Sequence, residues 1–412
     1  MKPLLPLLAL AATLHAAPPE PKFRAVTIDE KIQIGYGVAV ADVDGDKLPD
    51  ILLADKKQFV WYRNPGAEKS GDPAAWVKFI LAENLTKNDN VCLAAQDIDG
   101  DGKCEIAVGA EWNPGDTVNS GAIFYLIPPA DRTQKWEPVK FPNVEPTTHR
   151  MKWIEVPTNL GTPSWGLVVV PLHGRGNKNG EGATVKVLFY HKPVDVHGEW
   201  KSEIVDESMH MTHNLLALQT PGTRLGEGIL ICGREGIGQS VRQVKDWPGI
   251  RWSPISAKLM ISDDEPVGKG GVGEVASGVL EVLPFVATVE PMHGNTLAVY
   301  VRADAFRFRR QQLTDRLIEG HALKCGDMLG WGMDQIVVGW RAMGKPEAKV
   351  GVHVWTALDP EGKDWRDSAV DDGGMACEDL VLADLNGDGK LDIVASGRAT
   401  HNVKVYFNET PR

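Results

Sequence analysis

The stretch "DLNGDGKLDIVASGR", residues 384–398, contains the repeating unit that decides the fold. It has acids or Asn at its first, third, fifth and ninth positions, Gly at its fourth, and an apolar run from its tenth. Two more copies are clear: "DVDGDKLPDILLADK" from Asp42 and "DIDGDGKCEIAVGAE" from Asp97. Weaker copies, aligned on the apolar run, have their first positions at Glu155, Gln219, Leu280 and Asp327. The chain therefore repeats one unit seven times, at spacings from 47 residues (280 to 327) to 64 residues (155 to 219).

Repeats of this length are typical of propellers. Each unit reads as four short strands, one before the acid loop and three after it, but the last unit has only three before Arg412. Residues 22–30, "KFRAVTIDE", have the pattern of the missing strand. A strand supplied from the other end of the chain closes the ring and removes its free edges. We therefore expect an all-β fold, a seven-bladed β-propeller with four-stranded blades, over residues 18–412.

The N-terminus has the features of a secretory signal. Lys2 precedes a mostly apolar run over residues 4–14, and small residues follow near Ala16 and Ala17. The run is too short to span a bilayer, and no later segment reaches ~18 uninterrupted apolar residues. We expect residues 1–17 to be a cleaved signal peptide, no membrane span, and export to the periplasm or the extracellular space.

Charge and cysteine content exclude other classes of protein. The formal net charge of −11 argues against a nucleic-acid partner, which would require a basic surface. The five cysteines include no C-x-x-C pair, so they are expected to be buried small hydrophobic residues. The segment "GKGGVGEV", residues 268–275, resembles a phosphate loop, but Glu274 stands where that loop needs a lysine.

The acid loops have the composition of calcium sites. Alternating acids place several oxygens within reach of one hard cation, and the glycine permits a sharp turn. An apolar strand follows each loop, so the helix of an EF-hand is absent. We expect structural Ca²⁺ in three loops, against the alternative of a solvated acidic turn. The ligands would be Asp42, Asp44, Asp46 and Asp50; Asp97, Asp99, Asp101 and Glu105; and Asp384, Asn386, Asp388 and Asp392.

These three loops resemble FG-GAP/VCBS repeats, which form calcium-loop propellers in secreted proteins and integrin α-chains. The resemblance covers three units closely and the other four weakly. It implies the same propeller fold and a calcium ion that stabilises the turn between two strands without taking part in chemistry.

Polar residues recur in one slot, six residues before each first position. The slot holds Tyr36, Val91, His149, His213, Glu274, His321 and Glu378. Near the end of the second strand lie Lys56, Glu111, Arg234, Glu290, Arg341 and Arg398, with His173 and His293 in the corresponding turns. Both sets belong at the end of the axis opposite the acid loops. They are expected to form one channel mouth, against the alternative of ordinary polar residues in a wet channel.

The sixth unit has lost the oxygen ligands of its acid loop but retains polar residues at the mouth. Its loop from Asp327 has Leu329, Trp331 and Gln335 where the other loops carry oxygen ligands, yet it retains His321 and Arg341. Imidazoles with carboxylates suit Zn²⁺ or a similar ion, and arginines suit an anionic oxygen. The loss of acids at one end and the gain of a histidine at the other predict a functional site at the mouth.

Two stretches resemble the propeller part of aldos-2-ulose dehydratases: "IEGHALKCGDMLGWGMDQIVVGWR", residues 318–341, and "FVATVEPMHGNTLAVY", residues 285–300. Fungal members of that family remove water from keto-sugars such as 1,5-anhydrofructose. They also carry cupin-like domains, which we do not expect within these 412 residues, so the isomerase step and the identity of the substrate are not implied. The resemblance implies a metal-assisted carbon–oxygen lyase that acts on a keto-sugar within the propeller.

Roles for the mouth residues follow from this chemistry. We expect His149, His213, His293 and His321 to surround the metal, and Glu290 or Glu274 to act as the base, with His293 and Arg341 also catalytic. A positioned base removes a proton next to a carbonyl if the resulting charge is stabilised. Substrate binding is assigned to Arg234, Arg341, Arg398 and Tyr36. The alternative is a non-catalytic scaffold that binds a glycan or a protein, because fold alone does not settle function.

Overall fold

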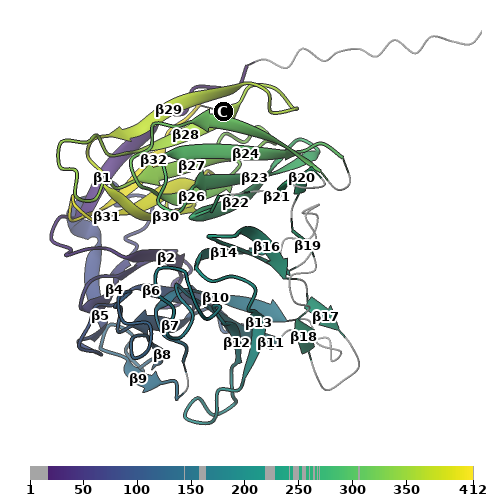
Figure 1. The fold of residues 1–412 in the computed structure, drawn as a ribbon. Coiled ribbons are helices and arrows are strands. Elements are labelled where there is room, and N and C mark those ends of the chain that lie inside the picture. The colour runs from purple at the N-terminus through teal and green to yellow at the C-terminus, as the bar shows by residue number, and fades with distance from the viewer. Residues whose placement is uncertain are drawn as a thin grey trace, which may run out of the picture.

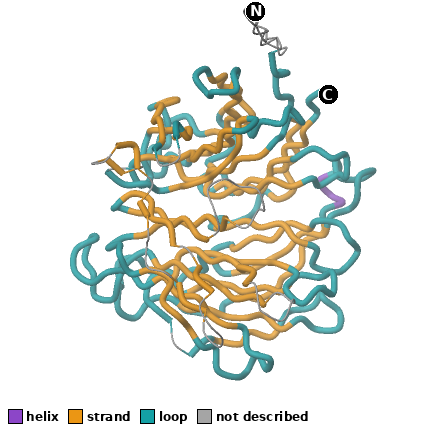
Figure 2. The backbone as a smooth tube through the Cα atoms, turned by 90° about the vertical axis from the view of Figure 1, so that its right-hand side faces the viewer, coloured by secondary structure: helices purple, strands orange, loops and turns teal. Residues whose placement is uncertain are grey.

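The structure, a computed structural model, describes residues 17–411 except 143, 157–163, 219–227, 241, 245–249, 253–256, 259, 263–264, 267, 269 and 305–306. The expected signal peptide, residues 1–17, lies almost entirely outside the described residues. Strands and loops dominate the chain, and the one helical segment among the described residues is the short 3-10 helix η1 (Pro73–Ala75) (Figure 2). No helix in the described part of the chain is long and apolar enough to cross a membrane.

Seven four-stranded antiparallel sheets form the seven blades of a β-propeller, which confirms the predicted fold class. Blades 1 and 2 comprise, from the axis outward, β2 (Gly37–Ala41), β3 (Asp50–Ala54), β4 (Gln58–Arg63), β5 (Val77–Glu83), and β6 (Cys92–Gln96), β7 (Glu105–Ala110), β8 (Ala122–Ile127), β9 (Glu137–Lys140). Blades 3 and 4 comprise β10 (Thr148–Val156), β11 (Ser164–Pro171), β12 (Val187–His191), β13 (Ser202–Asp206), and β14 (Thr212–Leu218), β15 (Gly228–Gly233), β16 (Gly236–Ser240), β19 (Ala257–Lys258).

Blades 5 and 6 comprise β22 (Glu274–Leu280), β23 (Leu283–Glu290), β24 (Thr296–Arg302), β25 (Phe308–Thr314), and β26 (Gly320–Gly326), β27 (Gln335–Trp340), β28 (Gly351–Ala357), β29 (Trp365–Asp372). Blade 7 comprises β30 (Cys377–Ala383), β31 (Asp392–Gly397), β32 (Asn402–Asn408) and β1 (Phe23–Asp29). Two hairpins lie outside the blades, β17 (Arg242–Val244) with β18 (Ile250–Trp252) and β20 (Met260–Ser262) with β21 (Glu265–Pro266).

The ring is closed by the two ends of the chain, as the sequence predicted. Strand β1 pairs antiparallel with β32, and Phe23 lies opposite Asn408. Val26 and Ile28 of β1 are buried against blade 7 and blade 1. The fourth strand of the last blade therefore comes from the N-terminal end.

The seven inner strands surround the axis. Each of them contacts the inner strands of both neighbouring blades, from β2 through β6, β10, β14, β22 and β26 to β30 and back to β2. Figure 1 shows blades 5 to 7 in its upper half and blades 1 to 3 in its lower half, with β14 between them. The buried apolar clusters lie mainly between adjacent blades, as in the cluster that joins Leu52 and Trp61 of blade 1 to Ile106 and Phe124 of blade 2. This packing fixes the position of each inner strand.

The strand pairing separates two ends of the axis. In blade 1, Gly37 lies opposite Ala54 and Ala41 lies opposite Asp50. The acid loop, residues 42–49, therefore connects β2 and β3 at one end. The start of β2 and the end of β3 share the other end, which we call the mouth. The five cysteines are unpaired, and four of them are buried, as expected.

Candidate metal centre and channel mouth

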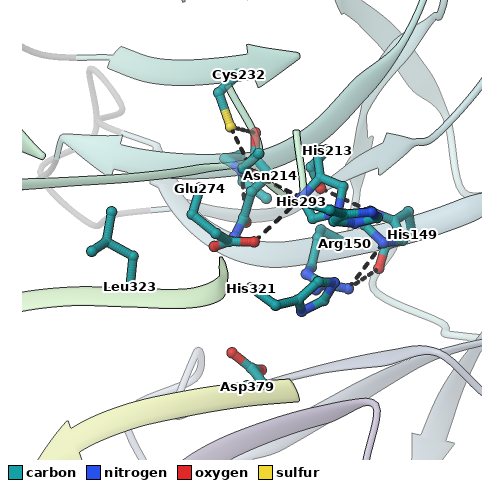
Figure 3. Close-up of polar contacts among 12 residues, drawn as sticks. His149, Arg150, His213, Asn214, Cys232, Glu274, His293, His321, Leu323 and Asp379 are labelled. Atoms are coloured by element: carbon teal, nitrogen blue, oxygen red, sulfur yellow. Dashed lines mark hydrogen bonds and ion pairs between the residues drawn. The ribbon is translucent and has the colours of Figure 1, made fainter. Parts of the chain in front are cut away.

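Three histidines from three blades converge at the mouth (Figure 3). His213 is the second residue of β14 in blade 4, His321 is the second residue of β26 in blade 6, and His293 lies in the β23–β24 turn of blade 5. One ring nitrogen of each lies within 4.8 Å of the others. The Nε2 atoms of His213 and His293 are 2.7 Å apart. The structure thus brings together three of the four predicted metal ligands.

Backbone irregularities aim the slot residues at the axis. In blades 3, 4 and 6 the pairing of the inner strand shifts at the slot, between Thr148 and Arg150, Thr212 and Asn214, and Gly320 and Ala322. The residue left unpaired at each shift is a histidine: His149, His213 or His321. Such bulges redirect a side chain and are frequent next to functional sites. His293 has a positive φ of 51°, which is uncommon for a residue with a side chain.

Each slot histidine is oriented by a carbonyl group of the next blade. The Nδ1 atom of His213 lies 2.7 Å from the oxygen of Gly273, and that of His321 lies 2.6 Å from the oxygen of Glu378. A carbonyl only accepts a hydrogen bond, so Nδ1 carries the proton in both rings and Nε2 carries the lone pair. Orientation of this kind is what metal-binding histidines require.

Burial keeps these imidazoles neutral. It lowers the pKa of His213 to about 3 and, with the charges of His213 and Arg341, lowers that of His293 to about 2. The pKa of His321 is also held well below its usual value, first by burial and then by Arg341. Nε2 of His293 donates to the lone pair of His213 Nε2 at 2.7 Å, and a cation could take the place of that proton. Three neutral imidazoles whose ring nitrogens converge fit Zn²⁺ or another borderline cation.

His149 lies beside this group and has different contacts. Its ring centroid is 4.6 Å from that of His213, and it stacks on Trp112 at 5.1 Å. Its Nδ1 donates to the carbonyl oxygen of His213 at 2.8 Å, while Nη1 of Arg150 lies 3.3 Å from its Nε2. His149 is therefore not part of the group formed by His213, His293 and His321. Its ring lies next to that of His213, and its lone pair is on Nε2.

Glu274 lies behind His213. Its Oε1 is 3.3 Å from Nδ1 of His213, and its Oε2 accepts a hydrogen bond from Asn214 (Figure 3). Unlike the slot histidines, Glu274 sits in regular register opposite Val289. Burial raises the pKa of its carboxyl group. Because Nδ1 of His213 already donates to Gly273, Glu274 is a neighbour of the imidazole and not its hydrogen-bond partner.

Glu290 belongs to a different polar cluster. Its carboxylate accepts hydrogen bonds from Thr288 and Tyr300 and forms an ion pair of 2.7 Å with Arg310. All these partners lie in blade 5. The structure therefore does not bring Glu290 into contact with the imidazoles, although the sequence placed it at the same mouth.

Two of the predicted substrate-binding arginines share one carboxylate at the rim. Nη1 of Arg341 lies 2.8 and 2.9 Å from the two oxygens of Glu378, and Nη1 of Arg398 lies 3.0 Å from one of them. The guanidinium group of Arg398 also covers the ring of Tyr36 at 5.1 Å. Burial raises the pKa of Tyr36 to about 12, so its hydroxyl remains a hydrogen-bond donor.

Arg234 lies apart from this group. It donates to the carbonyl oxygen of Gly180 at 2.6 Å and pairs with Glu181 at 2.7 Å, and nearly half of its side chain is exposed.

The sequence analysis did not single out three cationic residues on the same inner strands as the histidines: Arg150, Lys152 and Lys324. Their position, one to three residues after a slot histidine, was the available signal.

The acid loops have one shared backbone arrangement at the other end of the axis. The first acid of each loop, Asp42, Asp97 or Asp384, accepts hydrogen bonds from the backbone N–H groups three and five residues later. In the loops from Asp42 and Asp97, three carboxylates also approach within 4.8 Å of one another. The carboxylate oxygens of these two loops therefore lie close to one another.

The ninth position of the loop has a backbone role. Asp50, Glu105 and Asp392 each accept a hydrogen bond from the N–H group of the loop's second residue. In blade 6, Oε1 of Gln335 accepts the equivalent bond from Met328 at 2.8 Å. A neutral side chain thus preserves the turn where the acids are missing.

Calcium binding should depend on pH. Burial raises the pKa of Asp50 and Glu105 to about 7 and that of Asp392 to about 6. The folded pKa of each carboxyl group exceeds its unfolded pKa of about 4. Chelated protein should therefore lose stability as the pH rises from about 4 to about 7. Calcium should reverse this loss by binding the ionised carboxylates. The rise in melting temperature on adding Ca²⁺ should be large at about pH 8 and small at about pH 5.

Calorimetry of the chelated and calcium-loaded protein measures this effect. Asp50→Asn, which imitates the neutral amide of Gln335, should retain the turn and weaken the response to calcium, whereas Asp359→Asn outside the loops should leave it unchanged. A melting temperature that does not respond to Ca²⁺ at either pH would show that the loops are only acidic turns.

Two family models match parts of this chain, one over the histidine-containing blades and one over the first acid loops. Residues 120–303 match the family model for the aldos-2-ulose dehydratase beta-propeller domain. The chain is similar to that domain. The matched region includes His149, His213 and His293, while His321 lies beyond it. Residues 37–108 match the FG-GAP-like repeat, and this region contains the first two acid loops.

Solved structures show the same fold at low identity. Sqt1 of Saccharomyces cerevisiae has a TM-score of 0.50 and 12% identity, with 96% of this chain and 100% of that chain covered. An ancestral GH74 enzyme has a TM-score of 0.53 and 13% identity, with 92% and 45% covered. BBS1N in complex with ARL6DN has a TM-score of 0.51 and 11% identity, with 94% and 96% covered. No curated protein matches the sequence.

Proposed function

We propose that this protein is a metal-dependent carbon–oxygen lyase that dehydrates a keto-sugar at the channel mouth. The observation that carries the proposal is the convergence of the nitrogen donors of His213, His293 and His321 within 4.8 Å. The similarity of residues 120–303 to a dehydratase propeller domain supports the same reaction class. Export of the chain and structural calcium in its acid loops are parts of the same proposal.

His213, His293 and His321 would hold the metal. A bound Zn²⁺ or similar ion would supply Lewis acidity toward the carbonyl oxygen of the sugar. Arg341 and Arg398, already paired with Glu378, would contribute positive charge where negative charge develops on oxygen.

His149 is the proposed proton acceptor at this site. It lies next to His213, and its Nδ1 donates to a carbonyl, so Nε2, which Arg150 approaches at 3.3 Å, is the basic atom. Burial and Arg150 hold its pKa well below the usual value, which keeps it neutral. A proton leaves the carbon next to the carbonyl, the hydroxyl group departs with a proton as water, and the sugar becomes an enone. His149 then returns to its neutral form.

The test combines elemental analysis with an activity screen. Purified protein should contain zinc or a similar transition metal in stoichiometric amount, and incubation with keto-sugars, including 1,5-anhydrofructose, should produce ultraviolet absorbance from an enone. His149→Asn preserves a donor for the carbonyl of His213, so it should retain the metal and lose turnover. Absence of both metal and enone formation would overturn the proposal.

The alternative is a non-catalytic FG-GAP scaffold that binds a glycan or a protein. The match of residues 37–108 to the FG-GAP-like repeat is the observation that favours it. Under this alternative the three histidines would bind no metal, and a glycan would bind without chemical change.

A further inference from the structure

A cavity of about 300 Å³ lies inside the channel, behind the imidazoles. Its walls come from the inner strands of blades 1, 2, 3, 4, 6 and 7, beginning one residue beyond the slot in each blade except blade 6, where Lys324 lies three residues beyond. Lys152 lines this cavity and is exposed, so solvent reaches it. The volume is large enough for a small polyatomic solute with some water.

Three cationic side chains line the cavity: Arg150 and Lys152 from β10, and Lys324 from β26. Arg150 donates to the carbonyl oxygen of His149 at 3.2 Å, and Lys324 donates to that of Leu323 at 3.3 Å. Across the described residues, no carboxylate forms an ion pair with any of the three. None of the three therefore has a carboxylate in direct contact, and charges without such a partner are costly in an enclosed site.

Two acids near the cavity, Asp379 and Glu274, attract Arg150 and Lys324 without contacting them. Asp379 lines the cavity, but its oxygens accept hydrogen bonds from the backbone N–H groups of Val38 and Leu380. Glu274 is next to His213 and is not one of the residues that line the cavity. Protein around Lys152, together with the charge of Lys324, lowers the pKa of that lysine. The cavity thus has an excess of positive charge.

We propose that this channel cavity binds a small oxyanion, held by Arg150, Lys152 and Lys324. Convergent, unpaired cations in an enclosed, solvent-connected space are the pattern that favours an anion over water alone. The anion has two possible sources: free phosphate, or the carboxylate of an acidic keto-sugar whose carbonyl end lies at the histidines. The second source rests on the proposed function, and the first is independent of it.

Isothermal titration calorimetry with inorganic phosphate and with 2-keto-D-gluconate tests the site in metal-free and zinc-loaded protein. At least one probe should bind. Lys152→Met and Lys324→Met should each weaken that binding by about tenfold or more, because a charge-assisted hydrogen bond is lost. Lys349→Met, which changes an exposed lysine in blade 6, should leave the affinity unchanged. Lys324→Arg should retain much of the affinity, because it preserves the charge.

The outcomes separate the two sources. Phosphate binding that is independent of zinc identifies a free oxyanion site, and this result stands even if the chain has no lyase activity. Tighter binding of 2-keto-D-gluconate in the presence of zinc identifies an acidic substrate that spans cavity and histidines. Failure of both probes to bind, or equal affinities in the wild type and the folded methionine variants, would overturn the proposal. If the methionine variants fail to fold, a phosphate-dependent rise in wild-type melting temperature over chloride of equal ionic strength replaces them, and its absence is equally decisive.

Discussion

Replacing His321 with Asn should remove the transition metal and reduce turnover by about two orders of magnitude or more, while the propeller stays folded. The amide nitrogen of Asn lies near the position of Nδ1 and preserves a donor for the carbonyl oxygen of Glu378, which His321 contacts at 2.6 Å. Nothing in Asn replaces Nε2. The substitution therefore separates the ligand function of His321 from its structural function.

Zinc content, enone formation and the denaturant midpoint should be measured on the same preparation. His321 is buried, so His321→Ala should also strand the carbonyl of Glu378 and cost about 1–3 kcal/mol of stability. His191→Ala, which removes a histidine paired with Glu203 in blade 3, is the matched control and should retain metal and activity. Full zinc occupancy in His321→Asn would show that His321 is a hydrogen-bonded core residue and not a ligand.

Deletion of residues 18–30 should destabilise the whole ring by about 5 kcal/mol or more, enough to unfold an ordinary domain. The deletion removes β1, exposes the edge of β32, and uncovers the cluster that buries Val26 and Ile28. An exposed edge also invites pairing with another chain. The truncated protein should therefore aggregate or melt far below the full chain.

A shorter deletion provides the control. Residues 18–21 include Pro18 and Pro19, whose carbonyl groups accept hydrogen bonds from Arg366, but none of β1. Removing only these residues should change the melting temperature little. If deletion of residues 18–30 leaves a monomer with an unchanged melting temperature, β1 is not needed for closure of the ring.

The architecture could be predicted from the sequence because it depends on local pattern. The acid loop and the strand after it recur in every clear copy, and their period alone specifies blades. The missing strand of the last copy and the spare strand at residues 22–30 specified the closure that β1 and β32 form. The sequence also predicted that the slot residues share the mouth, because a position six residues before each loop marks the same end of every inner strand.

The membership of the site could not be predicted, because tertiary structure decides which slot residues meet. The bulges at His213 and His321 redirect those side chains to the axis, whereas Glu274, in regular register, lies behind His213. Glu290 had an equivalent place in the sequence, but Tyr300 and Arg310 hold its carboxylate within blade 5. A bulge depends on how two strands pair, and pairing leaves little trace in one strand's sequence.

The charged cavity could not be predicted from the sequence for the same reason: tertiary structure decides which residues line it. Arg150 and Lys152 are about 170 residues from Lys324 in the chain, and in isolation each reads as an ordinary polar residue of a strand. Only closure of the ring brings β10 and β26 to one channel, where none of the three charged groups forms an ion pair among the described residues. The sequence determined the blades and the ends of their strands, and tertiary packing decided which side chains share the axis, because that depends on register and ring closure.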